Sequence, residues 1–238
     1  MSLKSFVRAA LRMDDNLQSR RRWLKKALGD VPAGSKILDA GAGERQNQAL
    51  CGHLQYVSQD FCQYPGTGPE IGLHKGEWNT KGIDIVSDIT AIPVADAAFD
   101  AVLCSEVLEH VPDPLQALKE LCRVTAPGGA LILTAPFASV VHSAPYYFTS
   151  GFSRYWYEHH LAANGFDIIE LSRNGSWHDA LWQEVVRLPS MQRHASIVAF
   201  LAAIVFLPVA YVMLRPFGNW KDRELSCFGW HCIAKKRA

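Results

Sequence analysis

The sequence predicts an α/β fold, in which a doubly wound and mainly parallel sheet carries helices on both faces. Two observations support this prediction. Short apolar segments alternate with helical segments along most of the 238 residues, which is typical of repeated βα units. The apolar segment at residues 36–39 also leads into a Gly-x-Gly turn at Gly41 and Gly43, as the first strand of a nucleotide-type βαβ unit does.

Helical segments are recognised by their apolar spacing and by the residues that end them. The turn residues Gly29, Gly128 and Asn164–Gly165 are expected to stop the first, third and fourth helices. The expected helices cover residues 1–30, a segment that starts near 46, residues 114–124 and residues 154–163.

Seven strands are expected between these helices. They cover residues 36–39, 56–59, 83–86, 99–104, 130–134, 166–171 and 228–234. Residues 99–104 are nearly all apolar, as a strand buried on both faces should be. Residues 61–82 are rich in Gly, Pro and polar side chains, so we expect a long loop there, and loops of this length are often functional.

Composition limits the class of protein. Apolar residues make up 49% and charged residues 20%, which is enough for one substantial core and argues against disorder. The net charge of +1 gives no overall signal for nucleic-acid binding. Residues 1–36 hold nine Lys or Arg against three Asp, so this segment either meets an anionic surface or is a solvated helix face.

The six cysteines form no CxxC pair and no zinc spacing, and no His, Asp or Glu cluster has ligand spacing, so no metal site is expected. The N-terminus shows no secretory signal. We therefore expect a cytoplasmic protein, with the inner face of the membrane as the alternative place.

Residues 195–214 are twenty residues without a charge, nearly all apolar, and meet the minimum length of a membrane span. Pro208 is expected to kink or break a helix there, and basic residues flank both ends. A helical hairpin that contacts the membrane surface peripherally is favoured. A hairpin buried against the domain, or against a second copy in a homodimer, is the alternative.

The glycine turn also indicates the ligand. A pyrophosphate-binding turn would place a third glycine at position 46, where the chain has Gln46. The carboxylate of Asp39 would repel a pyrophosphate, whereas it suits the positive charges of S-adenosylmethionine. The charge argument therefore favours a methyl donor over a dinucleotide.

From these residues onward the chain resembles the class I S-adenosylmethionine-dependent methyltransferases, most closely the small-molecule branch with quinone-biosynthesis and sugar-modifying enzymes. The resemblance covers about residues 36–171 and implies a seven-stranded Rossmann-like sheet. It assigns Asp39, Gly41 and Gly43 to the methionine end of the donor, although Arg45 stands where many members have a third glycine.

Two further motifs of the resemblance concern the rest of the donor. Asp60 corresponds to the acid that binds the ribose hydroxyls, and Asp88–Ile89 to the adenine contact. The segment 99–111 matches the family's fourth motif and adds Ser105 and Glu106 to the expected donor site.

Methyl transfer needs alignment of donor and acceptor, and an alcohol acceptor also needs a base, most often His. His142, in an aromatic-rich loop after the fifth strand, is the preferred candidate, and His110 after the fourth strand is comparable. We expect O-methylation of a small or lipid-linked acceptor, such as a quinone precursor or a lipid-linked glycan.

Two other classes stay open, namely a non-catalytic donor-binding or membrane scaffold and, less favoured, a nicotinamide-dependent oxidoreductase. The expected organisation is a basic N-terminal helical segment at residues 1–35 and a methyltransferase domain at 36–238. An apolar insertion at residues 178–224 precedes the last strand of this domain.

Overall fold

The computed structural model describes residues 15–66, 72–73, 76–192, 196–214 and 224–238. It divides into two compact units, one formed by Met1–Arg21 with Arg173–Phe228 and the other by Arg22–Ser172 with Gly229–Ala238. The expected helical content of residues 1–14 lies outside the described residues. The proposed domain boundary at residue 35 stays a prediction.

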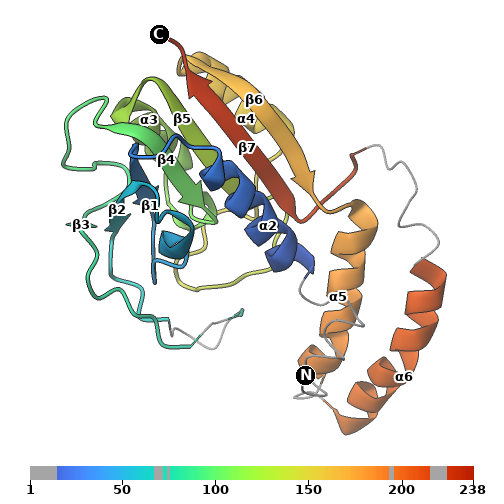
Figure 1. Cartoon of the computed structure of the whole chain (residues 1–238). Helices are drawn as coiled ribbons and strands as arrows, with labels where there is room; N and C mark the ends of the chain where they lie inside the picture. Colours follow the sequence, from blue (N-terminus) through green and yellow to red (C-terminus); the bar gives the residue numbers. More distant parts are fainter. Residues whose placement is uncertain (1–14, 67–71, 74–75, 193–195, 215–223) are drawn as a thin grey trace. The chain divides into compact units, whose positions relative to one another are not determined.

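The second unit is built on a seven-stranded sheet with the strand order β3-β2-β1-β4-β5-β7-β6 (Figure 1). Strands β1 to β5 pair in parallel, and β7 runs antiparallel to β5. The expected doubly wound, mainly parallel fold is therefore confirmed. The strands are β1 (Lys36–Ala40), β2 (Gln55–Asp60), β3 (Ile85–Val86), β4 (Phe99–Ser105), β5 (Thr125–Pro136), β6 (Phe166–Asn174) and β7 (Gly229–Lys236).

Helices cover both faces of this sheet (Figure 1). The apolar side of α2 (Asp15–Gly29) packs on the sheet through Leu24 and Leu28, which join Ile37 and Leu103 in one buried cluster. Burial of such side chains contributes about 1.5 to 3 kcal/mol each, so this contact fixes the helix.

The two helices of the opposite face begin and end where the sequence predicts. They are α3 (Pro114–Val124) and α4 (Arg154–Ala163). The Asp113 side chain caps α3 by accepting the Gln116 N–H at 2.9 Å, and Pro114 fits the first turn because no partner is needed for its missing N–H. Gly165 follows α4 with a φ of +80°, the left-handed position that ends many helices.

Three expectations about elements are wrong. The helix expected from Gln46 is a single 3₁₀ turn, η1 (Gln48–Leu50), because few residues separate β1 from β2. The third strand is only Ile85–Val86. Residues 127–129 do not stop a helix, because α3 has already ended at Val124 and these residues form a bulge in which β5 shifts its register against β4.

The first unit contains a helical hairpin of α5 (Trp177–Gln192) and α6 (Ile197–Leu214). The two helices pack through Trp182, Val186 and Ala210, and the Trp182 and Tyr211 rings lie 5.5 Å apart. The hairpin expected within residues 195–214 is wrong, because residues 197–214 form the single helix α6, which pairs with α5. Of the kink or break expected at Pro208, the break is wrong, because α6 continues through Pro208.

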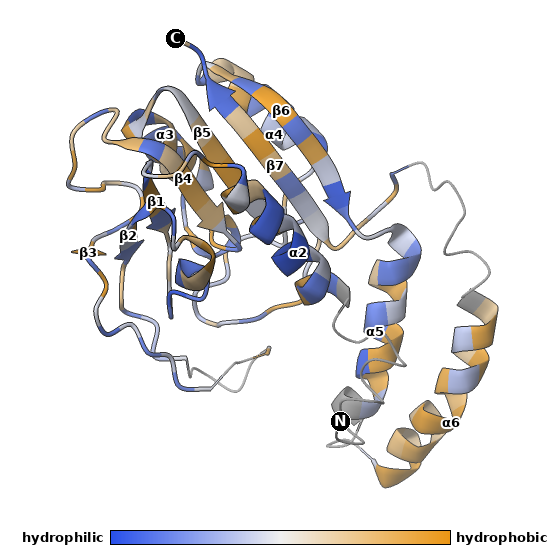
Figure 2. Ribbon diagram, viewed as in Figure 1, coloured by the Kyte–Doolittle hydropathy of each residue, from blue (hydrophilic) through white to orange (hydrophobic). Residues whose placement is uncertain are grey.

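The surface of α6 is apolar almost all round (Figure 2). Its outer stripe repeats at helical spacing and is exposed. The stripe consists of Val198, Leu201, Val205, Val209 and Val212. In the part of the chain that the structure describes, no helix combines the length and hydropathy needed to cross a bilayer.

Candidate functional site

The turn after β1 allows very close packing against its glycines. Gly41 and Gly43 have φ values of +72° and +53°, which side chains rarely adopt. A Cβ on Gly41 would lie 2.5 Å from the Val107 side chain, and one on Gly43 would lie 2.6 Å from the Trp78 ring. Both positions therefore require glycine, because the Val107 and Trp78 side chains pack directly against the turn.

The turn is held by the end of β2. The Gly41 N–H donates to the Gln59 carbonyl at 2.9 Å, and the Gly43 N–H donates to Asp60 Oδ2, also at 2.9 Å. The other oxygen of Asp60 accepts the Cys62 N–H at 2.8 Å. These bonds orient the buried Asp60 carboxylate, and each of its oxygens keeps a second lone pair that can accept from a ligand hydroxyl.

Arg45 stands where the family resemblance would place a third glycine. It adopts a φ of +55° itself, and its guanidinium donates to the carbonyl oxygens of Gly82 at 3.0 Å and Lys81 at 2.9 Å. Arg45 therefore ties the glycine turn to the loop before β3, which offsets the cost of a left-handed backbone at a residue with a side chain.

Asp39 does not line the cleft described below. It is 1% exposed, and its Oδ2 accepts the Tyr56 hydroxyl at 2.7 Å. Burial raises the pKa of Asp39 to about 6, although hydrogen bonds from Tyr56 and Asn47 oppose this shift. The expected direct role of Asp39 toward the donor's positive charge stays a prediction.

A cleft of about 470 Å³ opens at the carboxyl ends of the parallel strands. Ligands of open α/β sheets bind at this edge. Seven of the residues expected at the site line the cleft together. They are Gly41, Gly43, Asp60, Asp88, Ile89, Glu106 and His110.

One part of the cleft lining follows β3. Ile89 is buried, whereas Asp88 is exposed and its Oδ1 accepts the N–H and the hydroxyl of Thr90, both at 2.8 Å. An apolar surface beside a carboxylate can pack a flat ring and accept from its amine. Both residues line the cleft, and their expected contact with adenine stays a prediction.

Ser105 and Glu106 follow β4 but differ in position. Glu106 lines the cleft, and its Oε1 accepts the Thr134 hydroxyl at 3.0 Å. Ser105 is not among the lining residues, and its hydroxyl lies 2.8 Å from that of Thr134. Of this expected pair, only Glu106 is in position to contact a ligand in the cleft.

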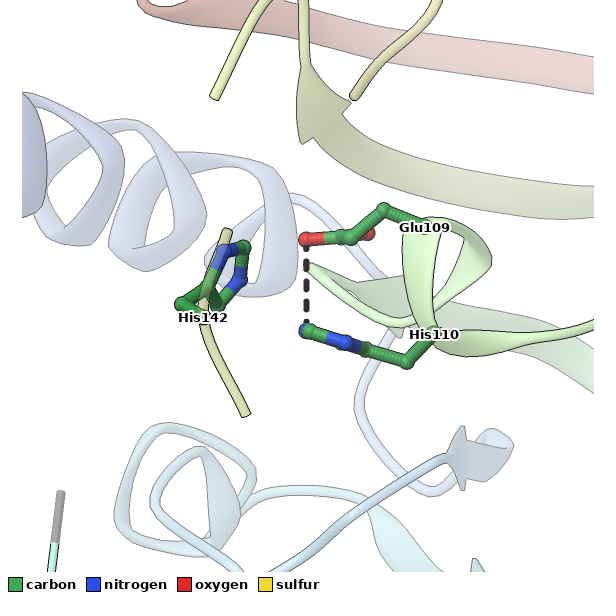
Figure 3. A group of neighbouring side chains, drawn as sticks. All are labelled: Glu109, His110 and His142. Atoms are coloured by element: carbon green, nitrogen blue, oxygen red, sulfur yellow. Dashed lines mark ion pairs between the residues drawn. The ribbon is translucent and has the colours of Figure 1, made fainter. Parts of the chain in front are cut away.

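The two candidate histidines lie side by side. His110 ends the 3₁₀ turn η2 (Leu108–His110) and lines the cleft, whereas His142 comes from the loop after β5 and is not a lining residue. Their ring centroids are 4.7 Å apart at an interplanar angle of 84°. Glu109, which the sequence analysis did not single out, lies beside them, and the three side chains point toward one another (Figure 3).

Aromatic side chains line the cleft, and only those of the loop after β5 were expected near an acceptor. The side chains come from the long loop after β2 and from the loop after β5. They belong to Phe61, Tyr64, Trp78, Tyr146 and Phe148. The sequence signal was available, because both loops are long and rich in aromatic residues, but sequence alone does not show which rings turn inward.

Comparison with known proteins identifies one domain of the chain. Residues 38–133, which include the end of β1, the glycine turn and most of β5, match a family model described as a methyltransferase domain. The chain carries a methyltransferase domain. This domain confirms the resemblance to the class I S-adenosylmethionine-dependent methyltransferases.

The curated relatives of this methyltransferase domain are also named as methyltransferases. A demethylmenaquinone methyltransferase of Renibacterium salmoninarum is 38% identical over 120 residues, which are 48% of this chain and 47% of that protein. A ubiquinone/menaquinone biosynthesis C-methyltransferase of Bdellovibrio bacteriovorus is 30% identical over 125 residues, 47% of this chain and 49% of that protein. The chain thus spans about half the length of these relatives.

Solved structures share the fold of the methyltransferase domain. The [4+2]-cyclase SpnF superposes with a TM-score of 0.56 at 18% identity, covering 90% of this chain and 80% of its own. The YcgJ protein of Bacillus subtilis gives a TM-score of 0.53 at 14% identity, covering 92% and 99%. At these identities the comparison shows the fold alone, and a cyclase on the same fold illustrates why activity needs separate evidence.

Proposed function

We propose that the chain transfers a methyl group from S-adenosylmethionine to a small or lipid-linked acceptor. The observation that supports this most strongly is the cleft, in which the glycine turn, Asp60 and Asp88–Ile89 of a methyltransferase domain meet at one edge of the sheet. Two quinone-biosynthesis methyltransferases among the relatives support a quinone-type acceptor.

The donor fits the residues present. Gly41 and Gly43 line the cleft together with Val107 and Trp78, against which a Cβ at either glycine would collide. The Asp60 carboxylate is held by two backbone N–H groups and has lone pairs left for two ribose hydroxyls. When it is bound, S-adenosylmethionine supplies an activated methyl group on a sulfonium, so the protein needs mainly to align donor and acceptor.

The acceptor is assigned to the end of the cleft near His110, Tyr146 and Phe148. Aromatic side chains bind a flat, apolar ring well, and an imidazole can receive the proton of a hydroxyl near neutral pH. We therefore propose methylation at oxygen, in which the acceptor hydroxyl loses one proton for each methyl group that it gains. His142 lies behind His110 and supports this end of the cleft.

We further propose that the exposed apolar stripe of α6 rests on a membrane surface. Quinone precursors and lipid-linked glycans are held there, and Val198, Val205 and Val212 are each at least 70% exposed. An apolar helix that lies in the interface buries such a surface in the lipid. A cytoplasmic protein attached to the inner face of the membrane fits this arrangement.

Calorimetric titration tests the donor proposal. Wild type is expected to bind S-adenosylmethionine at one site and to show no binding of NADH. Asp60→Asn removes a charge-assisted acceptor, which is worth about 1.5 to 3 kcal/mol, so the dissociation constant should rise about tenfold to a hundredfold. Asp167→Asn, the same change on an exposed residue of β6, is the matched control.

Tight binding of NADH without S-adenosylmethionine binding would instead support an oxidoreductase. Donor binding without transfer to any hydroxylated quinone precursor or lipid-linked glycan would support a donor-binding scaffold.

A further inference from the structure

The outer side of α2 carries a group of basic side chains that the proposed methyl transfer does not use. The helix contains five Lys or Arg, and after its first residue it contains no Asp or Glu. Arg22, Lys25 and Lys26 are all exposed. These three residues are called the basic face of α2 below.

The packing of α2 fixes the direction of this face. Leu24 and Leu28 are buried against the sheet in one cluster with Ile37. Arg22 and Lys26 each lie two positions from Leu24, which is more than half a helical turn, so they point away from the sheet. Residues three or four apart are neighbours on a helix, so the basic face of α2 is one continuous group of charges on a hydrophilic side of the helix (Figure 2).

Little of this charge is neutralised within the protein. In the part of the chain that the structure describes, no acid forms an ion pair with the basic face of α2. Glu170 of β6 is near Lys26, and its Oε1 accepts from Trp23 Nε1 and Ser172 Oγ, both at 2.8 Å. Burial alone would raise the pKa of Glu170, but these hydrogen bonds and the charge of Lys26 lower it. One carboxylate therefore stands against three cations.

Helix stability explains only part of these charges. Lys26 is in the last turn of α2, where a cation interacts favourably with the negative end of the helix dipole. Arg22 lies nearly two turns before the end of the helix, where this effect has faded. Arg22 and Lys26 are also four residues apart, so their like charges repel each other. An anionic partner would relieve that repulsion.

We propose that the basic face of α2 binds the phosphate groups of anionic phospholipids. This inference rests on the proposed function, in which the acceptor is lipid-linked, and it names the kind of membrane on which the acceptor is met. A membrane is favoured over a nucleic acid because the net charge of the chain is only +1. The apolar stripe of α6 cannot distinguish lipids by charge, whereas the basic face of α2 can.

Vesicle sedimentation with the full chain tests this proposal. Wild type is mixed at low salt with vesicles of phosphatidylcholine alone, or with vesicles that also contain anionic phosphatidylglycerol. Tighter binding to the anionic vesicles is expected. This preference should disappear as the salt concentration is raised, because salt screens exposed charges.

The double variant Lys25→Gln with Lys26→Gln removes two of the three charges and keeps residue types that favour a helix. Each Lys near an anionic surface strengthens binding about fivefold, so binding to anionic vesicles should weaken about tenfold to thirtyfold. Binding to neutral vesicles should not change. Lys81→Gln with Lys119→Gln removes the same charge from exposed positions outside α2, and this matched control should bind both kinds of vesicle like wild type.

Three results would overturn the proposal. Equal binding of wild type to both kinds of vesicle would show that lipid charge is not recognised. An equal loss in the control variant would show that only the total charge matters. Binding to duplex DNA or RNA that is tighter than binding to anionic vesicles, and that is lost in the α2 variant, would make a nucleic acid the partner.

Calorimetric titration with S-adenosylmethionine separates this proposal from the proposed function. The α2 variant is expected to keep its affinity for the donor while it loses the preference for anionic vesicles. If wild type binds no donor but still prefers anionic vesicles, the donor proposal fails and the lipid contact of α2 stands.

Discussion

Single residues in the donor site act through contacts that their sequence motif does not reveal. Asp60 is oriented by the N–H groups of Gly43 and Cys62, so its carboxylate is positioned before any ligand arrives. Asp39, from the motif of the glycine turn, is also buried, but it accepts from the Tyr56 hydroxyl and does not line the cleft. Two acids that look equivalent in the sequence therefore have different surroundings, and these surroundings lead to a prediction about stability.

The buried Asp39 should make stability depend on pH. Its pKa is 3.8 when exposed and about 6 when folded, so the folded state binds the proton more tightly and the free energy of unfolding falls as pH rises through this range. Asp39→Asn keeps the acceptor for Tyr56 and removes the charge. Relative to wild type it should gain about 2 to 3 kcal/mol between pH 4 and pH 7.

Urea denaturation at several pH values measures this difference. Asp167→Asn, on the exposed side of β6, is expected to show no such trend. A difference between Asp39→Asn and wild type that stays constant with pH would show that Asp39 is not held in a destabilising site.

At the scale of elements, the apolar helix α6 has one side packed on α5 and one side exposed. One side of α6 packs on α5 through Leu207, Ala210 and Tyr211. The other side presents an exposed stripe of Val and Leu, which no residue among those that the structure describes buries. Exposed stripes of this kind mark contacts, and the contact proposed for this one is a membrane surface.

Charges on that stripe should release the protein from lipid. The double variant Val205→Lys and Val209→Lys places two ammonium groups on exposed positions of α6, and lipid burial of each is unfavourable. Wild type is expected to sediment with lipid vesicles and the variant to stay in the supernatant. Ala162→Lys with Ala163→Lys, at the exposed end of α4, adds the same charge elsewhere and should sediment like wild type.

Sedimentation of the variant equal to that of wild type would contradict the membrane contact. If wild type is instead a dimer in solution and the same variant is a monomer, then α6 covers a second copy of the chain.

For the whole molecule, a ligand that binds only the folded chain must stabilise it. The cleft is lined by residues at the ends of β1 to β4 and by residues of the loop after β5. A donor bound there would contact both sets of residues at once. S-adenosylmethionine at about a hundred times its dissociation constant should add about 2.7 kcal/mol. For a chain of this size that raises the melting temperature by about 5 to 10 °C.

Thermal melting with and without the donor measures this shift. NADH serves as the control ligand and should leave the melting temperature unchanged. A shift with NADH alone would favour the oxidoreductase alternative.

Much of the fold was determined by the sequence alone. The apolar residues 99–104, the capped helix at 114–124 and the Asn164–Gly165 helix end carry their signals locally, within a few residues, and all three occur as predicted. Elements without a local signal were misjudged. The turn at Gln48–Leu50 is short because the next strand must begin nearby, and Pro208 stays within α6 because packing on α5 supports it.

The meeting of Gly41, Gly43, Asp60 and Asp88 in one cleft was likewise predictable from the sequence. These residues lie at or after strand ends, and the strand ends of a parallel sheet meet at one edge. Only the tertiary structure decided which side chains face one another across that edge. It buried Asp39, turned Trp78 inward and brought His142 beside Glu109 and His110. The physical reason is that strand order follows from local patterns, whereas the direction of a side chain depends on loop closure between residues far apart in the chain.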